Sequence, residues 1–155
     1  MTPAINAAKK NKISYHVHEY SHDVASDSYG EEAAQKLGIS TERVFKTLVV
    51  SIDNKVLIVA IIPVSAMLSM KLIAKAYGGK KAVMALKTDV ERSTGYVLGG
   101  VSPLGQKKCL RTFIDSSAMQ FTSLFVSAGK RGLEIELKPK DLQQLTQAKL
   151  AELCQ

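Results

Sequence analysis

The runs Val44–Ile52 (VFKTLVVSI) and Val56–Ile62 (VLIVAII) are separated by three polar residues, Asp53-Asn54-Lys55. Both runs are rich in β-branched residues, which favour strands. Two such runs joined by so short a polar segment are typical of a β-hairpin. Pro63 lacks the N–H that a sheet needs, so the second strand should end there. This hairpin is the centre of the predicted fold.

Shorter elements surround the hairpin on both sides. Further strands are predicted from apolar or alternating runs, at residues 14–20, 82–86, 111–114, 124–127 and 133–137. Helices are predicted where a capping residue or a proline precedes a helical stretch, with starts at Thr2, Ser28, Ser69, Thr88, Ser102 and Pro139. Strands that do not alternate regularly with helices indicate an α+β fold with a mixed or antiparallel sheet.

The size and composition are those of one globular domain, spanning residues 1–155. The chain is 46% hydrophobic and 23% charged, which excludes a disordered protein. Its longest apolar run, Val56–Ile62, is far shorter than the ~20 residues of a membrane span. The N-terminus lacks an apolar stretch of signal-peptide length. With only Cys109 and Cys154 present, we expect a cytoplasmic protein with reduced thiols.

The net charge of +7 is unevenly distributed along the chain. Between residues 15 and 42 there are six acidic residues and one lysine, whereas between residues 71 and 131 there are eleven basic residues and three acidic ones. A basic region of this kind suits a nucleic-acid phosphate backbone. It is equally typical of a solvated, lysine-rich face that keeps a protein soluble.

Lys46 is the most unusual residue of the first strand. Strand alternation places it on the same face as Val44, Leu48 and Val50. A lysine on an apolar face is costly to bury unless it lines a pocket or meets an anion. The alternative is a lysine near the end of an edge strand, where it reaches water or blocks edge pairing.

Two glycine-rich segments could bring the backbone close to a ligand. Gly95, Gly99 and Gly100 precede Ser102-Pro103, where a helical turn would present free N–H groups to an anion or oxyanion. Residues 127–132 (SAGKRG) form a second, basic glycine segment after a predicted strand. Either segment alone is also compatible with an ordinary turn.

The sequence offers neither a convincing metal site nor a convincing nucleophile. His16, His18 and His22 are close in sequence, but no third ligand with metal-binding spacing accompanies the pair on one strand face. The G-x-S-x-G signature of a nucleophilic serine is absent. We therefore expect chemistry without a metal, a cofactor or a protein nucleophile.

Five motifs follow one another along the chain, at residues 20–23 (YSHD), 44–48 (VFKTL), 92–96 (RSTGY), 99–105 (GGVSPLG) and 127–132 (SAGKRG). Together they resemble the YbaK/EbsC family of bacterial aminoacyl-tRNA deacylases, the Cys-tRNA(Pro) editing proteins. The resemblance runs nearly from end to end. It implies a single α+β domain with a curved mixed, mostly antiparallel sheet flanked by helices. The wider superfamily also includes domains that remove alanine from tRNA(Pro).

The resemblance assigns roles to individual residues. It implies that Lys46 is catalytic, and that the substrate is bound by residues matching the family's pocket, namely Tyr20, Tyr29, Thr47, Gly99, Gly100, Ser127, Gly129 and Glu134. At the position of Glu134 some relatives carry aspartate. The basic residues expected to meet the tRNA acceptor end are Lys80, Lys81, Lys107, Lys108, Lys130 and Arg131.

The activity implied by the resemblance is trans-editing, the removal of cysteine from mischarged tRNA(Pro) beside prolyl-tRNA synthetase. Cysteine and proline have similar volumes, so one binding site separates them weakly and a second site must remove errors. The family is thought to use the substrate's own thiol, which leaves the protein to orient the ester and stabilise its oxyanion. The alternatives are a water-dependent deacylase of broader range and a non-catalytic adaptor that binds tRNA or the synthetase.

Overall fold

The structure is a computed structural model that describes residues 1–23 and 29–155. Its strands are β1 (Tyr15–Glu19), β2 (Phe45–Ile52), β3 (Val56–Pro63), β4 (Ala82–Met84), β5 (Arg111–Asp115), β6 (Leu124–Lys130), β7 (Leu133–Leu137) and β8 (Lys149–Ala151). Its helices are α1 (Pro3–Lys10), α2 (Tyr29–Leu37), α3 (Met70–Tyr77), α4 (Lys87–Thr94) and α5 (Pro139–Thr146), with a 3-10 helix at Ser116–Gln120. The predicted α+β class is confirmed.

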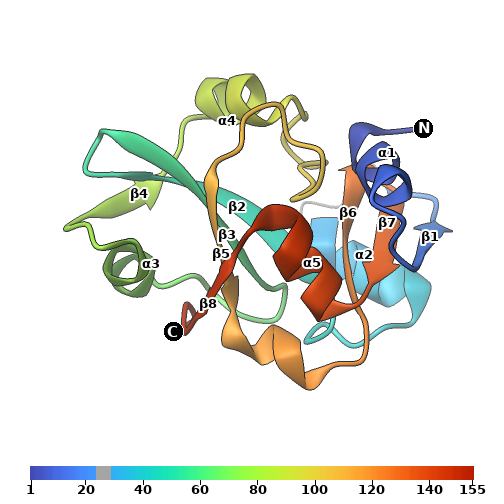
Figure 1. The fold of residues 1–155 in the computed structure, drawn as a ribbon. Helices are drawn as coiled ribbons and strands as arrows, with labels where there is room; N and C mark the ends of the chain where they lie inside the picture. Colours follow the sequence, from blue (N-terminus) through green and yellow to red (C-terminus); the bar gives the residue numbers. More distant parts are fainter. Residues whose placement is uncertain (24–28) are drawn as a thin grey trace.

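The strands are distributed over two sheets, of order β4-β2-β3-β5-β8 and β1-β7-β6 (Figure 1). The β3–β5 and β5–β8 pairs are parallel and the other pairs are antiparallel, so the larger sheet is mixed. A single bridge between Val44 and Phe125 brings the start of β2 beside β6. The two sheets therefore meet next to Lys46.

The predicted β2–β3 hairpin is confirmed. Asp53 and Asn54 both adopt positive φ, and the N–H of Lys55 donates to the carbonyl oxygen of Ile52 at 2.9 Å. Those are the features of a type I′ turn, whose twist matches that of the strands beside it. The hairpin register pairs Lys46 with Ile62 and Thr47 with Ile61.

Burial of β3 on both faces explains its uninterrupted apolar sequence. Val59 and Ile61 belong to one apolar cluster, which lies against α1 and β6. Ile58, Ala60 and Ile62 belong to a second cluster, which lies against α3. A strand buried on both faces loses the alternation that marks a half-exposed one. None of the helices in the described part of the chain is long and apolar enough to cross a membrane.

Several local predictions need correction. Helix α4 begins at Lys87 after Leu86, so Thr88 lies inside its first turn and does not cap it. Ser102 and Pro103 begin no helix, because the buried Ser102 hydroxyl accepts the N–H of Leu104 in a local turn. The helix predicted from Ser28 is observed as α2, but Ser28 itself lies outside the described residues. The fourth strand ends at Met84, two residues earlier than predicted.

Candidate functional site

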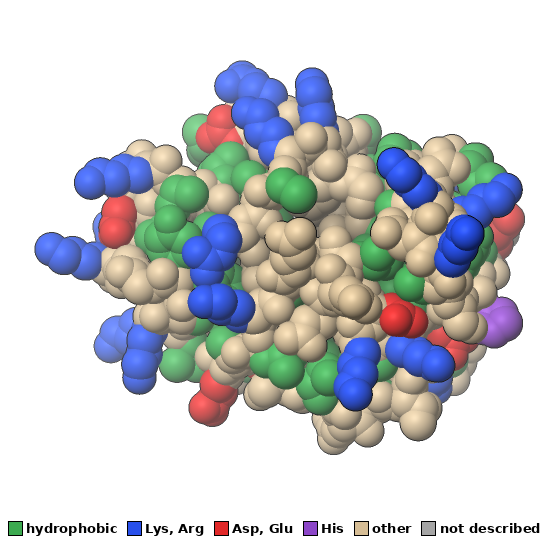
Figure 2. All heavy atoms as spheres, in the orientation of Figure 1, with side chains coloured by type: hydrophobic (Ala, Val, Ile, Leu, Met, Phe, Trp, Pro, Cys, Tyr) green, Lys and Arg blue, Asp and Glu red, His purple; other side chains and the backbone are tan. Residues whose placement is uncertain are grey.

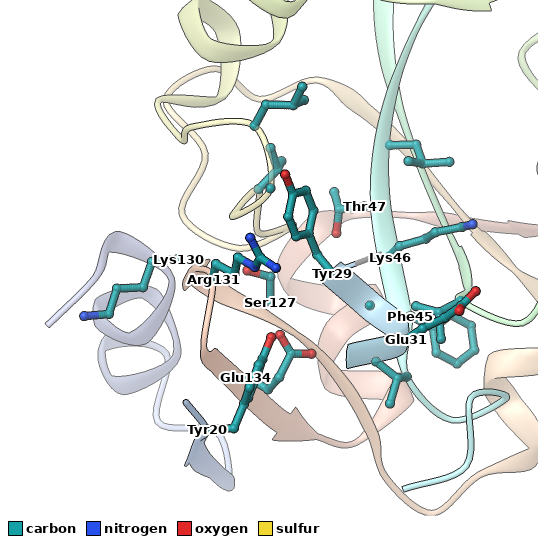
Figure 3. A pocket seen from close by; sticks show the side chains of 17 residues that line it. Tyr20, Tyr29, Glu31, Phe45, Lys46, Thr47, Ser127, Lys130, Arg131 and Glu134 are labelled. Carbon is teal, nitrogen blue, oxygen red and sulfur yellow. The ribbon is translucent and has the colours of Figure 1, made fainter. Parts of the chain in front are cut away.

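A pocket of about 300 Å³ lies where the two sheets meet (Figure 3). Its walls come from the beginning of α2, the first half of β2, the glycine segment after α4, and strands β6 and β7 with their connecting turn. These segments are distant in sequence. The fold brings them together because β4 pairs with β2 only at Val50–Ile52, which leaves the Lys46 end of β2 without that neighbour.

Most of the residues predicted for the site line this pocket. They are Tyr20, Tyr29, Lys46, Thr47, Gly99, Ser127, Lys130, Arg131 and Glu134. Gly100 and Gly129 are next to lining residues without lining the pocket themselves. The basic residues Lys80, Lys81, Lys107 and Lys108 also lie outside the lining.

Lys46 and Thr47 extend to opposite faces of β2. The Lys46 side chain points away from Tyr29, Thr47 and Ser127 in Figure 3. It lies on the face of Leu48 and Val50, as alternation predicts. Within the described chain the ammonium group forms no ion pair, so its charge remains available to an anion at the edge of the pocket.

Lys46 is close enough to the Cys154 thiol to influence its pKa. Burial and the neighbouring carboxylate of Asp115 raise the pKa of the Cys154 thiol to about 12, and Lys46 acts in the opposite direction. A thiol with so high a pKa is protonated at neutral pH and is a poor nucleophile. Cys154 therefore does not supply the nucleophile that the sequence lacks.

Two hydroxyl groups face the pocket with different hydrogen-bonding. Ser127 Oγ accepts the N–H of Gly129 at 3.1 Å, across the bulge in β6. Thr47 Oγ1 is buried and has no hydrogen-bond partner in the described structure. An unsatisfied buried hydroxyl is destabilising by about 1–3 kcal/mol, so such a group is a candidate for a hydrogen bond to a bound ligand.

Glu134 is the buried acid of the pocket, with 6% of its surface exposed. Burial raises its pKa to about 8, so much of the carboxyl stays protonated at neutral pH. Its side chain lies beside that of Tyr20 (Figure 3). Burial, and then the proximity of Glu134, raise the pKa of Tyr20. At this end of the pocket the two groups can donate hydrogen bonds without carrying charge.

The glycine segment approaches the neighbouring walls closely. Gly99 has φ of +98°, and a Cβ there would lie 3.0 Å from the ring of Tyr29. A Cβ on Gly100 would lie 2.7 Å from the Cα of Lys130. The N–H of Gly100 donates to the carbonyl of Val97, so Gly100 does not offer the expected oxyanion N–H. With no helix after Ser102, the cradle predicted here is reduced to the backbone around Gly99.

Sequence reasoning missed Glu32, which is 5% exposed at the beginning of α2. Its carboxylate accepts the N–H of Asp23 at 2.6 Å and pairs with Arg131 at 3.3 Å. Burial alone would raise its pKa, but these two partners and Lys36, whose Nζ lies 3.7 Å from the carboxylate, together lower it, so Glu32 is ionised at neutral pH. Arg131 is 99 positions away in sequence, and only the tertiary structure reveals the pair.

The predicted basic residues are dispersed over the surface. On the face in Figure 2, lysine and arginine side chains occur in several separate groups and form no single patch. Lys107 and Lys108 donate backbone N–H groups to Thr94 and Ser93, which places them beside the glycine segment. Lys80 and Lys81 instead bind the carboxylate of Asp53 through their backbone, at the turn of the β2–β3 hairpin.

The histidines and acids of the described chain form no group of three or more that could hold a metal ion. His18 Nε2 contacts Glu136 at 2.9 Å, and Arg43 contacts the other oxygen of the same carboxylate at 3.2 Å. This network belongs to the β1–β7 face and has no residue in the pocket.

Comparisons with known proteins found a matching family and similar chains. The model of the aminoacyl-tRNA editing domain matches residues 24–145. EbsC of Enterococcus faecalis, a proposed Cys-tRNA(Pro)/Cys-tRNA(Cys) deacylase, is 41% identical, and the match covers 98% of this chain and 92% of that protein. The uncharacterised protein YwhH of Bacillus subtilis is 30% identical over 77% of this chain and 76% of its own.

The fold is also similar to that of solved structures. The crystal structure of a proposed trans-editing enzyme for prolyl-tRNA synthetase superposes with a TM-score of 0.87 at 23% identity, covering 99% of this chain and 95% of that chain. At that level of identity the likeness concerns the fold. From the domain match and the end-to-end similarity to EbsC, the chain belongs to the aminoacyl-tRNA editing domain family, in its YbaK/EbsC group.

Proposed function

We propose that this protein removes cysteine from mischarged Cys-tRNA(Pro), acting in trans beside prolyl-tRNA synthetase. The observation that carries the proposal is the chemistry of the pocket. Within the described part of the chain, it holds a lysine without an ion-pair partner, a buried hydroxyl without a hydrogen bond and a buried carboxyl. Among the described lining residues there is no cysteine or histidine, and Ser127 Oγ accepts the N–H of Gly129. Such a site suits a substrate that carries its own nucleophile.

In the proposed reaction the substrate's thiolate attacks the carbonyl carbon of its own aminoacyl ester. A carbon–sulfur bond forms, the bond from that carbon to the ribose oxygen breaks, and the thiol proton ends on the ribose oxygen. The products are a cysteine thiolactone and the uncharged tRNA. The protein holds the ester in this geometry and stabilises the developing negative charge.

Two groups of the protein are assigned to stabilise the negative charge that develops on the ester. Lys46 serves an anion beside the scissile ester, either the oxyanion or the terminal phosphate, because its ammonium group has no partner in the described chain. The backbone N–H of Gly99 serves the oxyanion, since its neighbour Gly100 is already bonded to Val97. Thr47 and Glu134 supply hydrogen bonds to the aminoacyl group.

The proposal is tested by deacylation of tRNA(Pro) charged separately with cysteine, serine and alanine. We expect Cys-tRNA(Pro) to be cleared and the other two to be cleared poorly, because they lack a thiol. Replacing Lys46 with alanine should lower the rate roughly 100- to 1000-fold, the usual effect of removing a group that stabilises an oxyanion. Near wild-type activity of Lys46→Ala contradicts its role.

The same assay separates the two alternatives. Equal clearance of serine and alanine would favour a water-dependent deacylase of broad range. Binding of tRNA without cleavage of any ester would favour an adaptor. Adding prolyl-tRNA synthetase tests the partner, since we expect a protein with dispersed basic residues to bind tRNA weakly and to gain specificity from the synthetase.

A further inference from the structure

One wall of the pocket is an aromatic ring held between two distant segments. The ring of Tyr29 lies under the guanidinium group of Arg131, with 4.3 Å between the guanidinium carbon and the ring centroid. Its other neighbour is Gly99, where even a Cβ would come within 3.0 Å of the ring. Tyr29 is nevertheless 41% exposed, so packing against the protein interior does not fix its position.

The guanidinium group that covers the ring is itself anchored. Arg131 pairs with the buried carboxylate of Glu32 at 3.3 Å and donates to the carbonyl oxygen of Asp23 at 2.7 Å. Glu32 in turn accepts the N–H of Asp23 at 2.6 Å. A planar guanidinium that bonds a carboxylate at its edge and stacks on a ring with its face has its orientation fixed in both respects.

We infer that Glu32 and Arg131 are positioning residues, which hold the Tyr29 ring against Gly99 as a wall of the pocket. The sequence analysis placed Arg131 among the residues expected to contact tRNA. On this inference Arg131 does not bind a phosphate. The role of this wall in ester cleavage rests on the proposed function, whereas the placement of the ring by the ion pair does not.

The charge of Glu32 supports this assignment over contact with tRNA phosphate. To bind a phosphate, Arg131 would have to give up its pairing with a side chain that is 95% buried and ionised. Losing that pairing is unfavourable, although Lys36 at 3.7 Å and the N–H of Asp23 remain beside the carboxylate. Its neighbour Lys130 is more suitable, because its side chain extends away from the pocket cluster in Figure 3. The two adjacent basic residues therefore make a matched comparison.

A positioning role and a phosphate-binding role of Arg131 predict opposite effects of one substitution. Glu32→Gln removes the charge that holds Arg131 and keeps the shape of the side chain. If Arg131 positions Tyr29, Glu32→Gln and Arg131→Ala should both slow single-turnover deacylation roughly ten- to hundredfold, while the Kd for uncharged tRNA(Pro) stays within about twofold. Lys130→Ala should instead raise that Kd and lower its salt dependence. Tighter tRNA binding by Glu32→Gln, with weaker binding by Arg131→Ala, would overturn the inference.

A second readout needs no substrate. The chain has no tryptophan, so Tyr29→Trp introduces a single fluorescent reporter at the wall. Adding Glu32→Gln to this variant should shift its emission to the red and increase quenching by acrylamide; an unchanged signal refutes the positioning role. If Glu32→Gln fails to unfold cooperatively, Arg131→Lys is used, since it keeps the charge and loses the planar stack.

The two failures are distinguishable. Wild-type protein that clears no aminoacyl-tRNA contradicts the proposed function, and the reporter still tests the ion pair. Wild-type protein that clears Cys-tRNA(Pro), with a reporter insensitive to Glu32→Gln, contradicts this inference alone.

Discussion

At the scale of single residues, the pocket is notable for polar groups that the protein itself leaves unsatisfied or uncharged. Thr47 Oγ1 has no partner in the described structure, and burial keeps much of the Glu134 carboxyl in its protonated form at neutral pH. Such groups are retained against their effect on stability, which is typical of binding sites. The titration of Glu134 also contributes to the free energy of unfolding.

Glu134 should make the protein less stable as pH rises. Its pKa is about 8 in the folded state and has the ordinary value of 4.5 in the unfolded chain. Between these values the folded state binds more protons, so this group's stabilising contribution is complete below pH 4.5 and is lost as pH rises through 8. As pH rises from 5.5 to 8.5, we expect Glu134→Gln to gain stability relative to the wild type. The linkage between pKa and stability makes this gain about a few kcal/mol.

Urea unfolding of both proteins across that pH range measures the difference. The variant provides the control, because the three histidines and all other titrating groups are common to both proteins. Parallel pH profiles for the two proteins would show that Glu134 ionises normally in the folded state.

At the scale of elements, the site depends on close contacts between backbone segments. The glycine segment and the β6–β7 turn meet at Gly100, where a Cβ would lie 2.7 Å from the Cα of Lys130 and 3.2 Å from the N of Arg131. Neither contact can be relieved by rotating a flexible side chain. The segment that carries Gly99 and the turn that carries Arg131 therefore keep their spacing only with glycine here.

Gly100→Ala should separate these two walls. We expect a loss of about 1–3 kcal/mol in the free energy of unfolding, typical of an overpacked site, together with slower deacylation of Cys-tRNA(Pro). Gly38→Ala is the matched control, because Gly38 has φ of +69° but open space around it. It should lose about 1 kcal/mol through backbone strain alone and keep its activity. Wild-type stability and activity in Gly100→Ala would contradict the close contact.

At the scale of the whole molecule, the fold puts the predicted basic residues in two kinds of place. Lys107 and Lys108 lie beside α4 and the glycine segment, whereas Lys80 and Lys81 lie at the hairpin turn. On the proposed function, we expect a tRNA acceptor end that enters the pocket to pass the first pair. The net charge of +7 therefore gives a general attraction, and the position of each lysine decides its share in binding.

We expect the double variant Lys107→Ala/Lys108→Ala to weaken tRNA(Pro) binding more than Lys80→Ala/Lys81→Ala, although both remove the same charge. Its plot of log affinity against log salt should lose about one unit of slope for each phosphate contact removed. Filter binding at several salt concentrations measures both quantities. Equal effects of the two double variants would mean that only net charge matters.

The sequence predicted those features that depend on neighbouring residues. The β2–β3 hairpin follows from two apolar runs and a polar turn, and alternation alone placed Lys46 on the face of Leu48 and Val50. Most of the residues to which the motif resemblance assigned a catalytic or substrate-binding role lie in the pocket lining. These signals are local, and the fold agrees with them.

Features that depend on distant contacts were not predictable in this way. The pairing of Glu32 with Arg131 joins residues 99 positions apart, and the residues near Glu32 suggested only an acidic surface. Strand β8 has three residues and exists because it pairs with β5. Ser102-Pro103 has the local signature of a helix start, but the hydroxyl of Ser102 is used in a turn instead.

The opposite orientations of Lys46 and Thr47 have a consequence for how this chain can vary in length. Both neighbours of β2 are in fixed register, with Lys46 opposite Ile62 and Val50 opposite Met84. Loss or gain of one residue between Phe45 and Val50 would exchange the two faces, so the Lys46 and Thr47 side chains would change sides of β2. Insertions and deletions in homologous chains should therefore spare this stretch of β2 and accumulate at surface turns.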